Sequence, residues 1–312
     1  MVGLPVSIDL EIAGYEQSYP RGVCKIMALG PIDCRRWFEN SVDRVCAAVG
    51  KQYLPICRVS DGELHFLLGE QPFDFRLPLR RRLRSQLSRL RERIMLRGGI
   101  APFSAGHYHS GEFSAAEWLS ARREAPTLVR ALSLTGILAW HFSYASEPFQ
   151  ERYFPALGKW LSENKVEINW DNYMPFYFVY PMLTGRRRGE IFEGKNVLVI
   201  NGAEGEKKQA IIEGLKREGV RNVLWCSISL RRSYYDTVDV SGFRGKCDLV
   251  LVGAGIGKLR IMQQLGSLGV PCIDAGFVFE VLADRRNRFK RVMCATDSEW
   301  REIGSNPFLA QI

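Results

Sequence analysis

The C-terminal half of the chain alternates between short apolar runs and amphipathic runs of helix length. Apolar, β-rich runs predict strands at 196–200, 221–228, 248–252 and 270–273. Between them, apolar residues recur at helical spacing over 206–218 and 259–268. Strands separated by helix-length connections indicate a parallel sheet with crossover helices. We therefore expect an α/β, Rossmann-like fold with helices on both faces of the sheet and a helical N-terminal portion.

The N-terminal half gives a weaker pattern of the same kind. We predict a helix over 33–49, a strand over 54–59 and a helix that begins at Leu64. The apolar stretch 127–145 predicts a buried helix, because Arg130 and His141 interrupt it and a membrane span would need about 20 more uniformly apolar residues. The aromatic run 167–180 is typical of a core or a seam between domains.

A leucine and arginine pattern over 76–97 predicts one long helix. Apolar residues recur every three or four positions at Leu79, Leu83, Leu87, Leu90 and Ile94. Nine arginines share the segment, at 76, 80, 81, 82, 84, 89, 91, 93 and 97. We expect the leucine face to pack against the protein and the other face to present arginine, most simply to solvent. Its charge density also motivates the hypothesis that the helix faces a lipid-linked diphosphate or an anionic bilayer.

Composition limits the class of protein. A chain of 312 residues, 46% hydrophobic, can bury a substantial core. We divide it near the basic turn 185–189 into an N-terminal part, 1–184, and a nucleotide-type half, 185–312, within one continuous fold.

The N-terminus has neither the basic nor the long apolar region of a secretory signal, so we expect a cytoplasmic protein. The eight cysteines form no Cys-x-x-Cys pair, which indicates reduced thiols and disfavours zinc.

The net charge of +9 indicates attraction to a polyanion, which could be a phosphorylated small molecule, an anionic membrane or nucleic acid. A nucleic-acid binder is disfavoured because no aromatic RNA-binding motif accompanies the arginines. His107 and His109 lie in an irregular loop, and without a third ligand at a recognisable spacing they do not predict a metal site.

Glycines follow two of the predicted strands. Gly253, Gly255 and Gly257 lie between a strand and a helix, where backbone N–H groups can approach a phosphate closely. The same glycines could equally serve only to make a tight turn. Neither this loop nor 201–205 has the full Gly-x-Gly-x-x-Gly with an acid about 20 residues further on, which disfavours a dehydrogenase or a methyltransferase.

Asp61 and Glu63 are the most chemically suggestive acids. In extended or loop conformation, side chains two residues apart point to one side and could bind Mg²⁺ or Mn²⁺ together with a diphosphate. On a helix the two would diverge. Ser60 and Glu63 also fit a helix capping box, which spacing alone favours.

Three motifs together resemble the GT-D type of bacterial glycosyltransferase. They are Arg58-Val-Ser-Asp-Gly-Glu63, Gly253-Ala-Gly-Ile-Gly-Lys258 and Asp274-Ala-Gly276. Each motif is short, but their order and separation make the combination more specific. The resemblance implies a Rossmann-like enzyme that transfers a sugar from a nucleotide-sugar donor, with UDP as the expected nucleotide, to a glycan, glycopeptide or lipid-linked acceptor.

The resemblance also implies roles for individual residues. Asp61 and Glu63 would be catalytic and would hold Mn²⁺ or Mg²⁺, with Glu63 favoured as the direct ligand. The donor would be bound by Arg58, Gly253, Gly255, Gly257, Lys258, Asp274 and Gly276. Arg58 would neutralise phosphate or brace the acids, and Asp274 would bind a donor hydroxyl or hold the loop. An inverting reaction would need a general base, for which Glu204, Glu280 and His107 are candidates.

Overall fold

The computed structural model describes residues 34–59, 61–69, 79–99, 113–140, 157, 159–169 and 171–290. These residues form one seven-stranded sheet with the strand order β3-β2-β1-β7-β6-β4-β5. Each strand is parallel to its neighbours. The strands are β1 (Leu54–Val59), β2 (Ile137–Trp140), β3 (Tyr173–Pro175), β4 (Asn196–Asn201), β5 (Asn222–Ser227), β6 (Leu249–Gly253) and β7 (Pro271–Asp274). The predicted α/β fold is confirmed.

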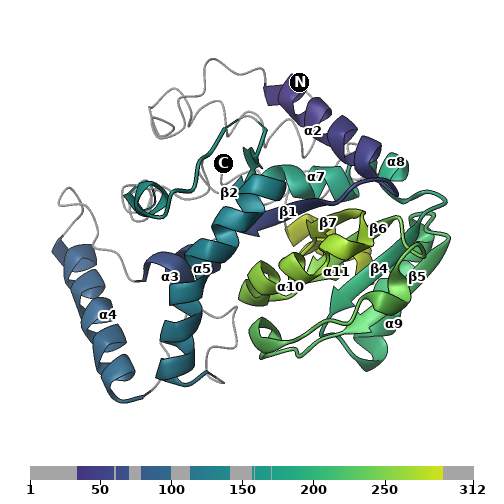
Figure 1. The fold of residues 1–312 in the computed structure, drawn as a ribbon. Coiled ribbons are helices and arrows are strands. Elements are labelled where there is room, and N and C mark those ends of the chain that lie inside the picture. Colours follow the sequence, from purple (N-terminus) through teal and green to yellow (C-terminus); the bar gives the residue numbers. More distant parts are fainter. Residues whose placement is uncertain are drawn as a thin grey trace, which may run out of the picture.

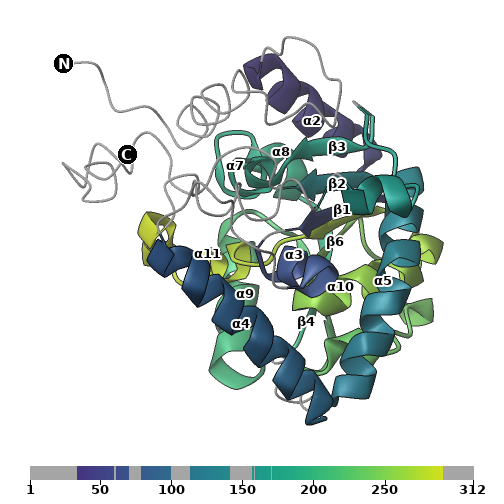
Figure 2. The same ribbon diagram turned by 90° about the vertical axis from the view of Figure 1, so that its left-hand side faces the viewer.

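Helices cover both faces of this sheet. They are α2 (Cys34–Ala48), α3 (Asp61–Leu68), α4 (Leu79–Arg97), α5 (Ala115–Thr135), α7 (Val179–Thr184), α8 (Arg188–Phe192), α9 (Gly205–Arg217), α10 (Lys258–Gln264) and α11 (Val278–Ala283). Figure 1 shows α5 and α10 in front of the sheet, and Figure 2 shows α9 and α11 on the opposite side. None of the helices in the described ranges is both long enough and apolar enough to cross a bilayer.

The sheet joins the two parts of the chain. Strand β1, from the N-terminal part, pairs with β7, from the C-terminal part, and Ile56 lies opposite Ile273. Both residues are fully buried, as expected for central strands with helices on each face. The carboxyl ends of β1 and β7 are therefore neighbours, although the chain separates them by more than 200 residues.

The predicted helix over 127–145 is wrong over 136–140, and its last residues, 141–145, lie outside the described residues. Helix α5 ends at Thr135, and β2 follows directly after Gly136. A Cβ atom at residue 136 would collide with the backbone carbonyl of Pro55, so the turn between α5 and β2 requires glycine. All four residues of β2 are buried, and a strand buried on both faces has the same continuous apolar sequence as a buried helix.

The prediction for the leucine face of α4 is also wrong. The helix forms, but Leu83, Leu87, Leu90 and Ile94 are 50%, 66%, 54% and 60% exposed. Figure 1 shows α4 at the left-hand edge of the molecule, beside α5, and Figure 2, which turns that side toward the viewer, shows it in front. Periodicity identified the apolar face correctly, but it carried no information about what would cover that face.

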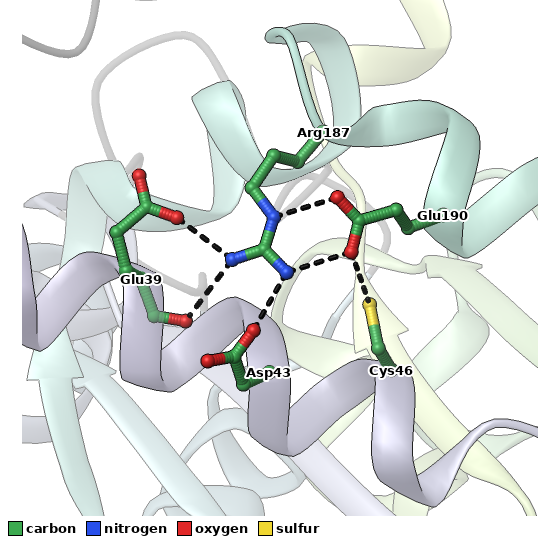
Figure 3. A network of polar contacts seen from close by, with 5 residues as sticks. All are labelled: Glu39, Asp43, Cys46, Arg187 and Glu190. Atoms are coloured by element: carbon green, nitrogen blue, oxygen red, sulfur yellow. Dashed lines mark hydrogen bonds and ion pairs between the residues drawn. The ribbon is translucent and has the colours of Figure 1, made fainter.

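The basic turn before α8 attaches this region to α2. The guanidinium of Arg187 contacts the carboxylates of Glu39 at 2.7 Å, Asp43 at 2.6 Å and Glu190 at 2.6 Å (Figure 3). These hydrogen bonds, first that to Glu190, raise the pKa of Arg187. Because the three carboxylates are exposed and Arg187 is partly exposed, we assign the cluster a positioning role and only a modest contribution to stability.

Buried cysteines give a first testable result. Cys57 in β1 and Cys272 in β7 are fully buried, and burial raises the pKa of Cys57 to about 12 and that of Cys272 well above its ordinary value. Thiols with such pKa values hold almost no thiolate at neutral pH. We expect both to resist Ellman's reagent in the native protein and to react in denaturant. Mass spectrometry of the labelled cysteines checks this, and rapid native labelling of Cys57 would contradict the packing of β1.

Candidate functional site

Four charged side chains meet at the carboxyl edge of the sheet. Arg58 lies near the end of β1, Asp274 ends β7, Glu63 is in the first turn of α3, and Lys258 begins α10. Each is buried: Glu63 is 0% exposed and Lys258 is 4% exposed. Four buried charges, two of each sign, are costly unless they compensate one another closely. We call these four residues the buried charge cluster.

Lys258 is the centre of the buried charge cluster. Its Nζ lies 2.7 Å from Oε1 of Glu63 and 2.6 Å from Oδ2 of Asp274. The Asp274 carboxylate also faces Arg58, whose Nε lies 3.3 Å from Oδ2. Each of the three motifs found in the sequence therefore contributes a charge to one compact cluster. The acidic element near residue 62 and the late glycine turn, which sequence alone could not place together, converge.

Arg58 packs against two neighbouring aromatic rings, whose centres lie 5.8 Å apart. Its guanidinium carbon lies 5.2 Å from the centre of the Phe176 ring and 5.0 Å from that of Tyr180. Burial alone would lower the pKa of Arg58, but the charge and hydrogen bond of Asp274, together with the charges of Tyr180 and Glu63, outweigh it and the pKa is raised. Among the described residues, Nη1 of Arg58 is buried without a hydrogen-bond partner. A buried donor of this kind is suited to an anionic ligand.

Gly276 makes the contact between Arg58 and Asp274 geometrically feasible. Its φ is +43°, in the left-handed region that favours glycine. A Cβ atom at this position would collide with Nη2 of Arg58. The Asp-x-Gly motif therefore has a packing explanation: aspartate supplies the counter-charge, and glycine leaves room for the guanidinium.

The glycine loop is braced by the protein itself. A Cβ atom at Gly253 would collide with the Asn201 side chain, and one at Gly257 would collide with Ser233. The carbonyl of Gly253 accepts a hydrogen bond from Asn201 Nδ2 at 3.2 Å, and that of Ala254 accepts one from Ser233 Oγ at 2.7 Å. These contacts support the tight-turn interpretation for Gly253 and Gly257. Donor binding by the loop stays a prediction.

Sequence reasoning missed the bracing residues Asn201 and Ser233 as parts of the site. Asn201 ends β4, so its place beside the carboxyl end of β6 could have been inferred from the predicted parallel sheet. Ser233 lies in a 3-10 turn, Ser233–Tyr235, that has no signal in the sequence pattern. Its contact with the glycine loop is visible only in three dimensions.

Asp61 and Glu63 lie in a helix and not in an extended segment. Helix α3 begins at Asp61, which is where the capping-box interpretation places it; Ser60 lies outside the described residues. On a helix, residues two positions apart point in different directions, so the argument for a side-by-side pair does not hold. The side chain of Asp61 also lies outside the described part.

The described residues do not by themselves complete a metal site. No three His, Cys, Asp or Glu side chains among them are grouped closely enough to hold an ion. Glu63 is already compensated by Lys258, whose ammonium would repel a divalent cation at the same carboxylate.

The general-base candidates are scattered. Glu280 forms an ion pair with Lys207 at 2.6 Å, and both side chains are about half exposed. Glu204 precedes α9 at the carboxyl end of β4. His107, together with His109, lies outside the described residues. No assignment of a base follows from these positions.

Comparison with known proteins gives a fold-level likeness. No family model matches the chain, and no curated protein matches its sequence. Two solved structures match at 15% identity and a TM-score of 0.44, covering 86% of this chain and 87% of theirs. One is a selenomethionine-substituted structure of domain of unknown function 1792, and the other is described as showing that this domain has a distinct glycosyltransferase fold. A TM-score this low carries no argument about activity, so the function is argued from the site.

Proposed function

We propose that the protein is a glycosyltransferase that moves a sugar from a nucleotide-sugar donor, with UDP as the expected nucleotide, to a glycan, glycopeptide or lipid-linked acceptor. The observation that carries the proposal is the buried charge cluster at the carboxyl edge of a parallel sheet. Ligands of open α/β sheets bind at this edge. Two cations held there beside a glycine loop are suited to a diphosphate.

The chemistry of sugar transfer matches such a cluster. Breaking the bond between sugar and diphosphate places negative charge on the leaving group. Cationic groups that are fixed before the reaction stabilise this charge without reorganising, and they act more strongly in a buried site than in water. Lys258 and Arg58 are the two cations of the buried charge cluster, and Nη1 of Arg58 is a donor that a phosphate oxygen could use. Glu63 and Asp274 hold the two cations in position.

Donor hydrolysis tests this proposal without knowledge of the acceptor. We expect the purified protein to release sugar slowly from one of a panel of nucleotide sugars, and to be stabilised by the same compound in a thermal-shift assay. Arg58→Met should reduce hydrolysis at least about tenfold, because one charge-assisted contact to the leaving group contributes roughly 1.5–3 kcal/mol. Lys159→Met is the matched control, since that lysine lies at the surface in an exposed pair with Glu163.

The same screen distinguishes other Rossmann-like enzymes. Stabilisation by S-adenosylmethionine or NAD alone, with no response to any nucleotide sugar, would replace this proposal by a methyltransferase or a dehydrogenase.

Binding of Mn²⁺ or Mg²⁺ by Asp61 and Glu63 stays a prediction. Because Lys258 already faces Glu63, we expect the affinity for the ion to depend on Asp61. Asp61→Asn should raise the Mn²⁺ concentration for half-maximal donor hydrolysis about tenfold or more, as loss of one carboxylate ligand would. Hydrolysis by the wild-type protein that persists unchanged in excess EDTA would exclude metal dependence, while leaving the transferase proposal to the donor screen.

A further inference from the structure

The exposed apolar face of α4 is the feature that the proposed function does not use. Its four described members lie one helical turn apart, at Leu83, Leu87, Leu90 and Ile94, and each is at least half exposed. Residues at this spacing form one narrow stripe along a helix. Four large aliphatic side chains in one exposed stripe mark an interaction site more often than isolated surface leucines do.

The opposite side of α4 holds the helix to the protein. Glu92 lies on that side, and its carboxylate pairs with Arg122 of α5 at 3.5 Å. Leu96 packs there against the core. Because this attachment uses the face away from the stripe, the leucines are presented outwards.

Arginines border the stripe along both sides. Helix α4 contains eight arginines and one acid, Glu92. Arg91 and Arg93 are exposed and, from helix geometry, lie roughly 80° to either side of the stripe. An apolar face between cationic flanks is the pattern of helices that lie in the plane of a membrane surface, where the apolar side chains enter the lipid and the cations meet anionic headgroups.

We infer that α4 is a docking helix for the surface of an anionic bilayer. Its 19 residues give a length of about 28 Å, enough to lie along the interface. A second copy of the chain is a poorer occupant, because pairing two such stripes would bring arginine-rich flanks together. Nucleic acid is also a poorer occupant than a bilayer, because its phosphates would bind the arginines and leave the leucines exposed. This inference is independent of the proposed activity.

Vesicle co-sedimentation of the full chain tests the inference. We expect binding to vesicles of phosphatidylcholine with phosphatidylglycerol, little binding to phosphatidylcholine alone, and weakening by salt. The variant Leu87→Gln/Ile94→Gln should lower the affinity for the anionic vesicles about tenfold or more, since it removes half of the described apolar stripe. Arg91→Gln/Arg93→Gln should also weaken binding. Leu134→Gln, at a site on α5 that is 77% exposed, is the control and should bind as the wild type does.

Three results would overturn the inference. In the first, Leu87→Gln/Ile94→Gln binds anionic vesicles as tightly as the control. In the second, the wild type is a dimer that does not bind vesicles, and the leucine variant is a monomer, which would identify a second copy as the occupant. In the third, the protein binds RNA in preference to vesicles, and the arginine variant loses that binding while the leucine variant retains it. Thermal unfolding of each variant establishes that the variant is folded, so that a loss of binding is not caused by unfolding.

Discussion

Lys258→Met is expected to lower the free energy of unfolding by about 3–5 kcal/mol, the cost of removing one partner from a buried ion pair. The variant would leave two buried carboxylates, those of Glu63 and Asp274, with one cation of the buried charge cluster, Arg58. Denaturant unfolding of the wild type and the variant measures the difference. Lys159→Met should change stability by less than about 1 kcal/mol, because its pair with Glu163 is exposed.

A second substitution separates charge from shape. Glu63→Gln in the Lys258→Met background removes the carboxylate that lost its contact with the lysine ammonium and should recover at least half of the lost stability. If the double variant is instead less stable than Lys258→Met, the contact between Lys258 and Glu63 does not carry the energy we assign to it. Equal, small losses in Lys258→Met and Lys159→Met would show that the buried charge cluster is open to water.

Gly276→Ala is expected to have the second large effect. Alanine would take the left-handed conformation at a cost of about 1–2 kcal/mol, and its Cβ atom would displace the Arg58 guanidinium at a further cost of about 1–3 kcal/mol. Because Arg58 is part of the proposed donor site, donor hydrolysis should fall as well. Denaturant unfolding measures the loss of stability, and the hydrolysis assay measures the loss of activity.

Gly245→Ala is the matched control for this prediction. Gly245 also has a positive φ, +68°, but nothing lies within 4 Å of the position that a Cβ atom would occupy. Gly245→Ala should therefore lower the free energy of unfolding by the cost of the left-handed conformation alone, without the cost of displacing Arg58. This variant should retain donor hydrolysis. If both variants lose the same stability, the collision with Arg58 is absorbed by a small movement and Gly276 has no special role in the site.

Much of the fold could be predicted from the sequence, because parallel strands and their crossover helices have distinct periodicities. The prediction of β1 at 54–59 matches the observed strand, and that for β4 differs by one residue. The helix predicted over 127–145 was wrong at 137–140, because a strand buried on both faces lacks alternation. The prediction that the leucine face of α4 packs against the protein was also wrong, because those leucines are exposed. Sequence periodicity identifies an apolar face but contains no information on the tertiary contacts that would cover it.

The sequence predicted which residues belong to the candidate site, but it did not predict which of them contact one another. Arg58 and Asp274 are 216 positions apart, and no local pattern states that they pair. The resemblance selected these residues as donor-binding groups, whereas the structure pairs Arg58 and Lys258 with Glu63 and Asp274. Phosphate access and a tight turn were equal alternatives for the glycines at 253, 255 and 257, and the structure gives 253 and 257 packing partners. Gly276, which the resemblance assigned to the donor site, lies against Arg58. Contacts of this kind depend on strand order, which periodicity does not specify.

Binding of UDP to the Lys258→Met/Glu63→Gln protein, measured by titration calorimetry, tests most directly whether the buried charge cluster receives a diphosphate. The double substitution leaves Arg58 and Asp274 in place and preserves the formal charge, so a folded variant tests the loss of the Lys258–Glu63 pair without a change in net charge. We predict that the wild type binds UDP and that the variant, folded by its unfolding curve, binds at least about tenfold more weakly. Equal affinity for UDP in the two proteins would contradict the account, since a cluster that receives the diphosphate could not lose its central cation without effect.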